Sequence, residues 1–131
     1  MSEKDGLGRA HERFGWTALA IALAFGVALE GLHGFKADAV ALDDLRREMW
    51  SLAHFHAVGL AIVNLVYASR ATNRAASRAL LAGSVLLPLG FLLGGVGHFE
   101  SDPGVGIMLA PAGALLVVYA VGAKAVELWR R

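Results

Sequence analysis

Apolar residues are gathered into four long stretches separated by short polar segments. Each stretch approaches the ~20 residues that an α-helix needs to cross a ~30 Å hydrocarbon layer. In hydrocarbon every backbone N–H and C=O must be paired within its own segment, so the stretches are predicted to be helices, and Pro88 and Pro111 are tolerated in them. They run from about Trp16 to Phe35, from Met49 to Ala68, from Ala79 to Phe99 and from Val105 to Ala123.

The connections between the stretches indicate how the helices are arranged. Those after the second and third stretches, 69–77 and 100–104, are short, and short connections favour antiparallel neighbours. The longer connection before the second stretch contains Ala39 to Glu48, which is predicted to form a short helix at the membrane surface. The sequence therefore predicts an all-α integral membrane protein, with residues 1–131 forming one antiparallel four-helix bundle.

Composition supports a membrane environment and excludes several function classes. Of the 131 residues 56% are hydrophobic and 18% are charged, and the mean hydropathy is +0.56. A soluble domain of this size has too little interior for so much apolar sequence, so apolar side chains are expected to meet lipid. The absence of cysteine excludes disulfides, thiolate metal sites, iron–sulfur clusters and a cysteine nucleophile. A net charge of +1 gives no support for binding nucleic acid.

The distribution of Lys and Arg predicts the orientation in the membrane. Nine of the twelve basic residues lie in the amino-terminal segment, in the connection after the second stretch, or at the carboxyl end. Basic residues accumulate on the cytoplasmic side of membrane proteins. Both termini are therefore predicted to be cytoplasmic, in a multi-pass protein of the inner membrane whose first stretch is retained as a span.

Four of the five histidines are predicted to lie at one depth, near the outer face. They belong to three different spans, and Glu30 lies one turn deeper than His33 on the same helix face. Neutral imidazole is a ligand for Zn, Cu and Fe, including heme iron. His11 lies elsewhere, in the predicted cytoplasmic amino-terminal segment. The predicted metal ligands are His33, His54, His56, His98 and Glu30.

Helix geometry separates His54 from His56. Successive residues turn by about 100°, so these two side chains project from their helix about 200° apart. They are predicted to serve different centres, or one ligates while the other forms a hydrogen bond. A polar cavity lined by His33, His54 and His98 is expected near the outer face.

Gly90 and Gly94 are spaced by four residues and lead to His98, which makes a smooth groove along the third span. Small residues at this spacing are typical of close helix packing. Alternatively, the two glycines form the surface against which a flat porphyrin lies, which makes them candidate cofactor-binding residues.

The segment from Trp50 to Leu60 reads W-S-L-A-H-F-H-A-V-G-L. It resembles a stretch of the heme–copper oxidase catalytic subunit, in which A-H-F-H at the outer start of a helix supplies axial ligands to two hemes. The resemblance implies that His54 and His56 are heme ligands. The chain lacks the many helices of that subunit and its histidine–tyrosine copper centre, so oxygen reduction is not implied.

Three functions are compatible with these patterns, and no catalytic residue is identified. The first is a redox-type membrane protein that holds heme b or a Cu, Zn or Fe ion, with quinol or a larger membrane complex as its partner. The second is a small proton-coupled transporter. Four spans with one membrane-embedded glutamate resemble the small multidrug resistance family, and the resemblance implies that Glu30 alternately holds protons and cationic substrates in a homo-oligomer. The third is a structural accessory subunit that packs through its glycine faces.

Overall fold

The computed structural model describes residues 3–37, 43–100 and 102–130, which form helices joined by short connections. Two of the helices start at side-chain caps. The carboxylate of Asp43 accepts a hydrogen bond from the backbone N–H of Arg46 at 2.9 Å, and Asn73 accepts one from Ala76 at 3.1 Å. The helices are α1 (Glu3–Gly34), α3 (Asp44–Ala68), α4 (Arg74–Val96), the 3-10 turn η1 (Val105–Met108) and α5 (Leu109–Trp129).

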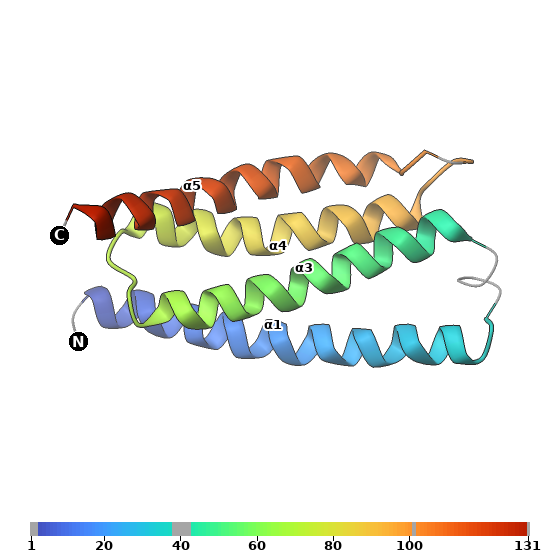
Figure 1. Cartoon of the computed structure of the whole chain (residues 1–131), viewed down its shortest axis with the longest axis horizontal. Helices are drawn as coiled ribbons and strands as arrows, with labels where there is room; N and C mark the ends of the chain where they lie inside the picture. The colour runs from blue at the N-terminus through green and yellow to red at the C-terminus, as the bar shows by residue number, and fades with distance from the viewer. Residues whose placement is uncertain (1–2, 38–42, 101, 131) are drawn as a thin grey trace.

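The four long helices form an antiparallel bundle in which sequence neighbours pack together. α1 packs on α3, α3 on α4 and α4 on α5, whereas in the described part of the chain α1 and α5 are not packed against each other. Figure 1 shows both termini and the 69–73 connection at one end, which we call the terminal end. The connection that leaves α1 and the α4–η1 connection lie at the other end, which we call the distal end.

Glycines allow α4 and α5 to approach closely. A Cβ atom on Gly90 would lie 2.4 Å from the backbone N of Ala110, and one on Gly113 would lie 2.4 Å from the backbone N of Leu87. Contacts this short with backbone leave no room for a side chain. The Gly94 face is likewise covered, because a Cβ there would lie 3.3 Å from Ile107. The structure supports the packing interpretation of Gly90 and Gly94, because η1 and α5 occupy the face that the porphyrin alternative requires.

Large apolar side chains point outward while the interior holds small ones. Val27, Phe55 and Leu115 are 73%, 77% and 72% exposed, and the buried core is dominated by alanine. All four long helices are long and apolar enough to cross a membrane. An outward apolar surface of this kind is favourable in lipid and costly in water. The chain is a multi-pass membrane protein.

The helix boundaries differ from the predicted stretches. α4 starts at Arg74 instead of about Ala79, and α5 ends at Trp129 instead of about Ala123. α1 begins at Glu3, well before the predicted span start at Trp16, so the amino-terminal segment is helical. Of the predicted surface helix from Ala39 to Glu48, residues 38–42 lie outside the described residues. Its remainder from Asp44 on is the first part of α3, because the Asp43 cap starts α3 there. Pro88 lies inside a continuous α4, as predicted.

Candidate functional site

A groove of about 510 Å³ lies between α1 and α3 in their distal halves, and we call it the α1–α3 groove. This volume is within the ~300–1,000 Å³ range of small-molecule sites. Glu30 and His33 of α1 and His54 of α3 all line it, with apolar neighbours between them. The structure therefore brings together three of the five predicted ligands. The lining residues are Leu23, Gly26, Val27, Leu29, Glu30, His33, Ser51, His54 and Phe55.

His54 reaches from α3 onto the backbone of α1. Its ring lies over Gly26, where a Cβ atom would come within 2.5 Å of the imidazole Cε1. The Nδ1 atom lies 3.0 Å from the carbonyl oxygen of Ala22. Because a carbonyl only accepts, Nδ1 carries the proton, and in the neutral ring Nε2 is left with its lone pair. A histidine whose second nitrogen is held in this way is in the tautomer that metal ligands use.

His33 has the same tautomer through a bond within its own helix. Its Nδ1 donates to the carbonyl oxygen of Leu29 at 3.0 Å, so its Nε2 is also unprotonated in the neutral ring. His33 and Glu30 are both exposed on the groove side of α1. These two side chains are one helical turn apart, which confirms that they share a helix face.

His56 faces away from the groove. Its ring stacks on Phe91 of α4, with a centroid separation of 4.9 Å and an interplanar angle of 21°. Its Nδ1 donates to the carbonyl oxygen of Leu52 at 2.8 Å. The prediction that His54 and His56 point to different sides of α3 is confirmed, since one contacts α1 and the other α4.

His98 does not line the groove and instead joins the α4–η1 connection to the start of α3. Its Nε2 donates to the carboxylate of Asp43 at 2.6 Å. The pKa of the Asp43 carboxyl is lowered, first by the hydrogen bond from the Arg46 backbone N–H, and further by His98 and the Arg46 side chain, against a smaller opposing effect of desolvation. Within the described residues, the groove that His33 and His54 line does not include His98, because the Asp43 carboxylate holds its ring elsewhere, so the predicted cavity shared by the three is not formed there.

The groove does not bring its ionisable groups into a compact cage. Among the described residues, no three His, Asp or Glu side chains are grouped so that they could hold a metal ion. What the groove offers is two imidazole Nε2 atoms from two helices, with one carboxylate beside them.

His11 belongs to the predicted cytoplasmic amino-terminal segment, for which the sequence indicated no role. In the structure it lies in α1 and is 0% exposed. Asn64 donates from Nδ2 to the carbonyl oxygen of Leu60 and to Ser84 Oγ, both at 2.8 Å, so its Oδ1 is an acceptor. His11 Nδ1 therefore donates to Asn64 Oδ1, at 2.7 Å. We call His11, Asn64 and Ser84 the His11 network.

A sequence signal for this burial exists. Gly8, Gly15, Ala22 and Leu29 are spaced by seven residues, and His11 lies one turn from the first two on the same face. A Cβ on Gly8 would lie 2.8 Å from the Ala68 carbonyl oxygen, so α1 and α3 pack closely here. The small-residue stripe thus continues past Trp16 toward the amino terminus, and it carries His11 into the interior.

Comparison with known protein families, curated protein sequences and solved structures finds no match for this chain. The local resemblance of Ala53 to His56 to the heme–copper oxidase catalytic subunit stays a prediction.

Proposed function

We propose that this chain is a redox-type membrane protein that holds a heme in the α1–α3 groove. His54 and His33 would hold the heme iron through their Nε2 atoms, and Glu30 would lie beside them. The observation that carries the proposal is the pair of imidazoles from two helices, each with Nδ1 bonded to a backbone carbonyl and Nε2 left as a lone-pair donor. Heme iron takes imidazole from this nitrogen.

A heme suits this groove better than a bare ion. A structural zinc site needs four ligands and a catalytic one three, whereas the porphyrin supplies the equatorial ligands of its own iron. One or two imidazoles from the protein then complete the coordination. Leu23, Val27 and Phe55 give the groove the apolar walls that a porphyrin face requires.

The groove is proposed to face the outer side of the inner membrane. The terminal end carries the surplus of basic residues, which indicates the cytoplasmic side. A membrane-impermeant thiol reagent applied from outside should label a cysteine at Asp102 and not one at Ser69, both of which are exposed positions. The reverse labelling pattern would place the groove on the cytoplasmic side.

The groove opens on the apolar surface of the bundle, which suits electron exchange with a lipid-soluble quinol. Glu30, exposed beside the imidazoles, is placed to accept a proton when a quinol is oxidised. A heme iron accepts one electron at a time, and each electron that a quinol gives up is accompanied by one proton, so a single carboxylate beside the acceptor would receive that proton. Quinol is the proposed electron donor on this ground.

The test is an absorption spectrum of the detergent-purified protein after incubation with heme. The intact chain should show a Soret band at a heme-to-protein ratio near one, and His54→Ala should abolish it. His56→Ala is the matched control, because His56 lies two residues away on the same helix but faces Phe91; it should retain the band. Glu30→Gln should weaken heme retention by about 10–100-fold, the effect expected of a residue that supports a ligand.

Two outcomes would overturn the proposal. One is the absence of a heme band in the intact chain, and the other is equal loss in His54→Ala and His56→Ala. If heme is absent while Glu30→Gln abolishes proton-coupled cation flux in vesicles, the result favours the transporter hypothesis. If neither heme binding nor proton-coupled flux is observed, and the substitutions change only assembly with other membrane proteins, the result favours the accessory-subunit hypothesis.

A further inference from the structure

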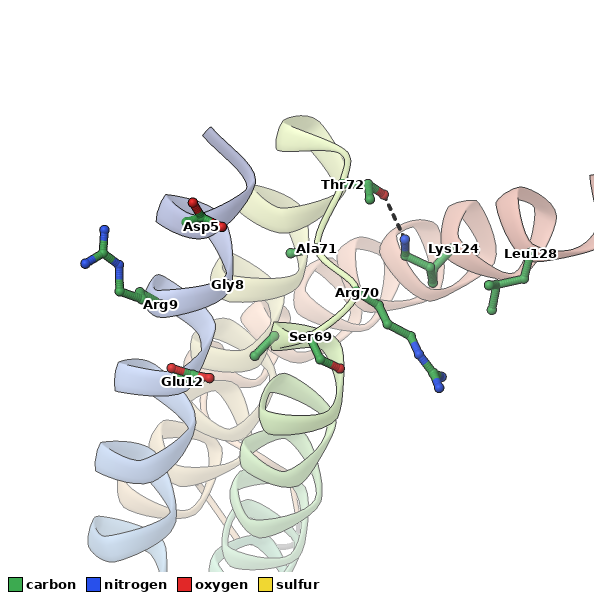
Figure 2. Close-up of a pocket in the computed structure, with 11 residues that line it drawn as sticks. Asp5, Gly8, Arg9, Glu12, Ser69, Arg70, Ala71, Thr72, Lys124 and Leu128 are labelled. Carbon is green, nitrogen blue, oxygen red and sulfur yellow. Dashed lines mark hydrogen bonds between the residues drawn. The ribbon is translucent and has the colours of Figure 1, made fainter. Parts of the chain in front are cut away.

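The terminal end contains a second, polar cavity of about 580 Å³, distant from the α1–α3 groove. It is bounded by the start of α1, the 69–72 segment and the end of α5. Figure 2 shows Arg9 and Arg70 on opposite sides of this cavity, with Glu12 and Ser69 between them. The charged residues that line it are Asp5, Arg9, Glu12, Arg70 and Lys124.

An apolar groove of about 260 Å³ adjoins this cavity between α3 and α5. Ile62, Val66 and Val121 line it on the side of the hydrocarbon layer. Arg70, Lys124 and Leu128 line both the groove and the polar cavity. The two spaces therefore meet at a pair of cationic side chains.

Apolar, cationic and acidic side chains line successive parts of the groove and the cavity. Apolar side chains of α3 and α5 come first, and the cations Arg70 and Lys124 lie at the junction. Beyond it, α1 contributes the carboxylates of Asp5 and Glu12, with Arg9 between them in the chain. A glycerophospholipid with an ethanolamine headgroup has the same order: acyl chain, phosphate, ammonium. We propose that this composite site binds one molecule of phosphatidylethanolamine, with its phosphate at Arg70 and Lys124 and its ammonium at the α1 carboxylates.

The Lys124 ammonium is held at the junction by its ion pair with Glu127. Lys124 Nζ donates to Thr72 Oγ1 at 2.8 Å and to Glu127 Oε2 at 2.6 Å, and it lies 5.7 Å from the centre of the Tyr67 ring. These contacts hold the ammonium in place and use two of its three N–H donors, so one donor remains for a phosphate oxygen. Arg70 is exposed, and its guanidinium supplies the planar fork that pairs with phosphate oxygens.

The carboxylates select among phospholipid headgroups. The primary ammonium of ethanolamine donates hydrogen bonds to Asp5 and Glu12, whereas a choline headgroup has no N–H and a glycerol headgroup has no positive charge. Binding of phosphatidylethanolamine should exceed that of phosphatidylcholine and phosphatidylglycerol of the same acyl chains by about fivefold, the upper range for an exposed ion pair.

Native mass spectrometry of the full chain, exchanged into detergent with each lipid in turn, measures this preference. Arg70→Ala should remove most of the bound phosphatidylethanolamine. Glu12→Gln should lower its binding to the level of phosphatidylcholine while leaving phosphatidylcholine binding unchanged. Arg78→Ala is the matched control, an exposed arginine at the same end of the molecule that does not line the site, and it should bind as the unsubstituted chain does.

The acyl part of the site has its own test. Val121→Trp should fill the apolar groove and displace the lipid, whereas Val118→Trp, at an exposed position of α5 outside the groove, should not. The thermal unfolding temperature with and without lipid gives a second readout for a variant that yields little protein. Equal binding of all three lipids, or equal effects of Arg70→Ala and Arg78→Ala, would overturn the proposal.

Discussion

The α1–α3 groove and the His11 network are both polar sites built from α1 and α3, yet their histidines are held in opposite ways. His33 and His54 line an open groove, and each bonds to a backbone carbonyl through Nδ1, which leaves Nε2 unprotonated in the neutral ring. His11 is enclosed between helices, and Asn64 links its Nδ1 to Ser84 of α4. The first arrangement leaves a ligand atom accessible, and the second uses the imidazole to join three helices.

The difference teaches that the depth of a histidine along a membrane helix does not indicate its role. Of the four histidines predicted to share one depth, His33 is exposed and the other three are half-buried, whereas His11 has no exposure. In hydrocarbon an interhelical hydrogen bond contributes about 0.6–2 kcal/mol, so a buried polar network is a sizeable part of the stability of a small bundle. We therefore expect the stability of the protein to depend on the His11 network and its binding activity to depend on the groove.

The largest expected effect is that of His11→Ala on stability. The substitution opens a cavity and leaves Asn64 Oδ1 without its donor, which together should cost about 3 kcal/mol. His33→Ala, at an exposed position of the same helix, should change stability by about 0.5 kcal/mol or less. Reversible unfolding in mixed micelles measures both. Similar losses in the two variants would remove the distinction between the two sites.

Ser84→Ala should have a smaller effect, about 1 kcal/mol. Asn64 Nδ2 would lose the Ser84 hydroxyl but keep the Leu60 carbonyl, so no donor group is left wholly unpaired. The same unfolding assay applies, and the double variant His11→Ala/Ser84→Ala should lose less than the sum of the two single losses because both act through Asn64. Strict additivity would show that the three residues do not act as one network.

Asp43→Asn tests the separation of His98 from the groove through its pH dependence. The pKa of Asp43 is lowered in the folded protein, so the ionised carboxylate stabilises the fold above the unfolded pKa of about 3.9, and this contribution is lost as pH falls through the folded pKa. Asn keeps an N-cap acceptor but has no charge. The unfolding temperature of Asp43→Asn should lie below that of the intact chain near pH 7, and the gap should close toward pH 3.

Heme retention should be unchanged in the same variant, because the Asp43–His98 pair does not line the groove. A loss of heme in Asp43→Asn would return His98 to the ligand set.

The smallest expected effect on stability is that of Glu30→Gln. Glu30 is exposed on the groove side of α1, so the change should shift the free energy of unfolding by no more than about 0.5 kcal/mol. Circular dichroism melts in the absence of heme give the comparison. A loss as large as that of His11→Ala would mean that Glu30 belongs to the structural framework of the bundle.

The sequence by itself determined the four helices, their antiparallel order and the opposed faces of His54 and His56. These features depend on segment length, backbone pairing in hydrocarbon and the 100° turn per residue, which are local properties of the chain. The resemblance at Ala53 to His56 and the predicted depth of the histidines are also local properties of the chain. They predicted His33 and His54 as candidate site residues.

Only the tertiary structure decided which ionisable groups meet. Helix rotation and pairing set this, and they follow from contacts between residues far apart in the chain, such as Gly26 with His54 and Gly90 with Ala110. The hydrogen bond to Asp43 holds His98 outside the groove. The close approach of α1 to α3 near Gly8 places His11 in the interior of the bundle. A periodic sequence pattern indicates which face of a helix is buried. The partner of each buried side chain depends on the register between two helices, and the sequence of one helix does not determine that register.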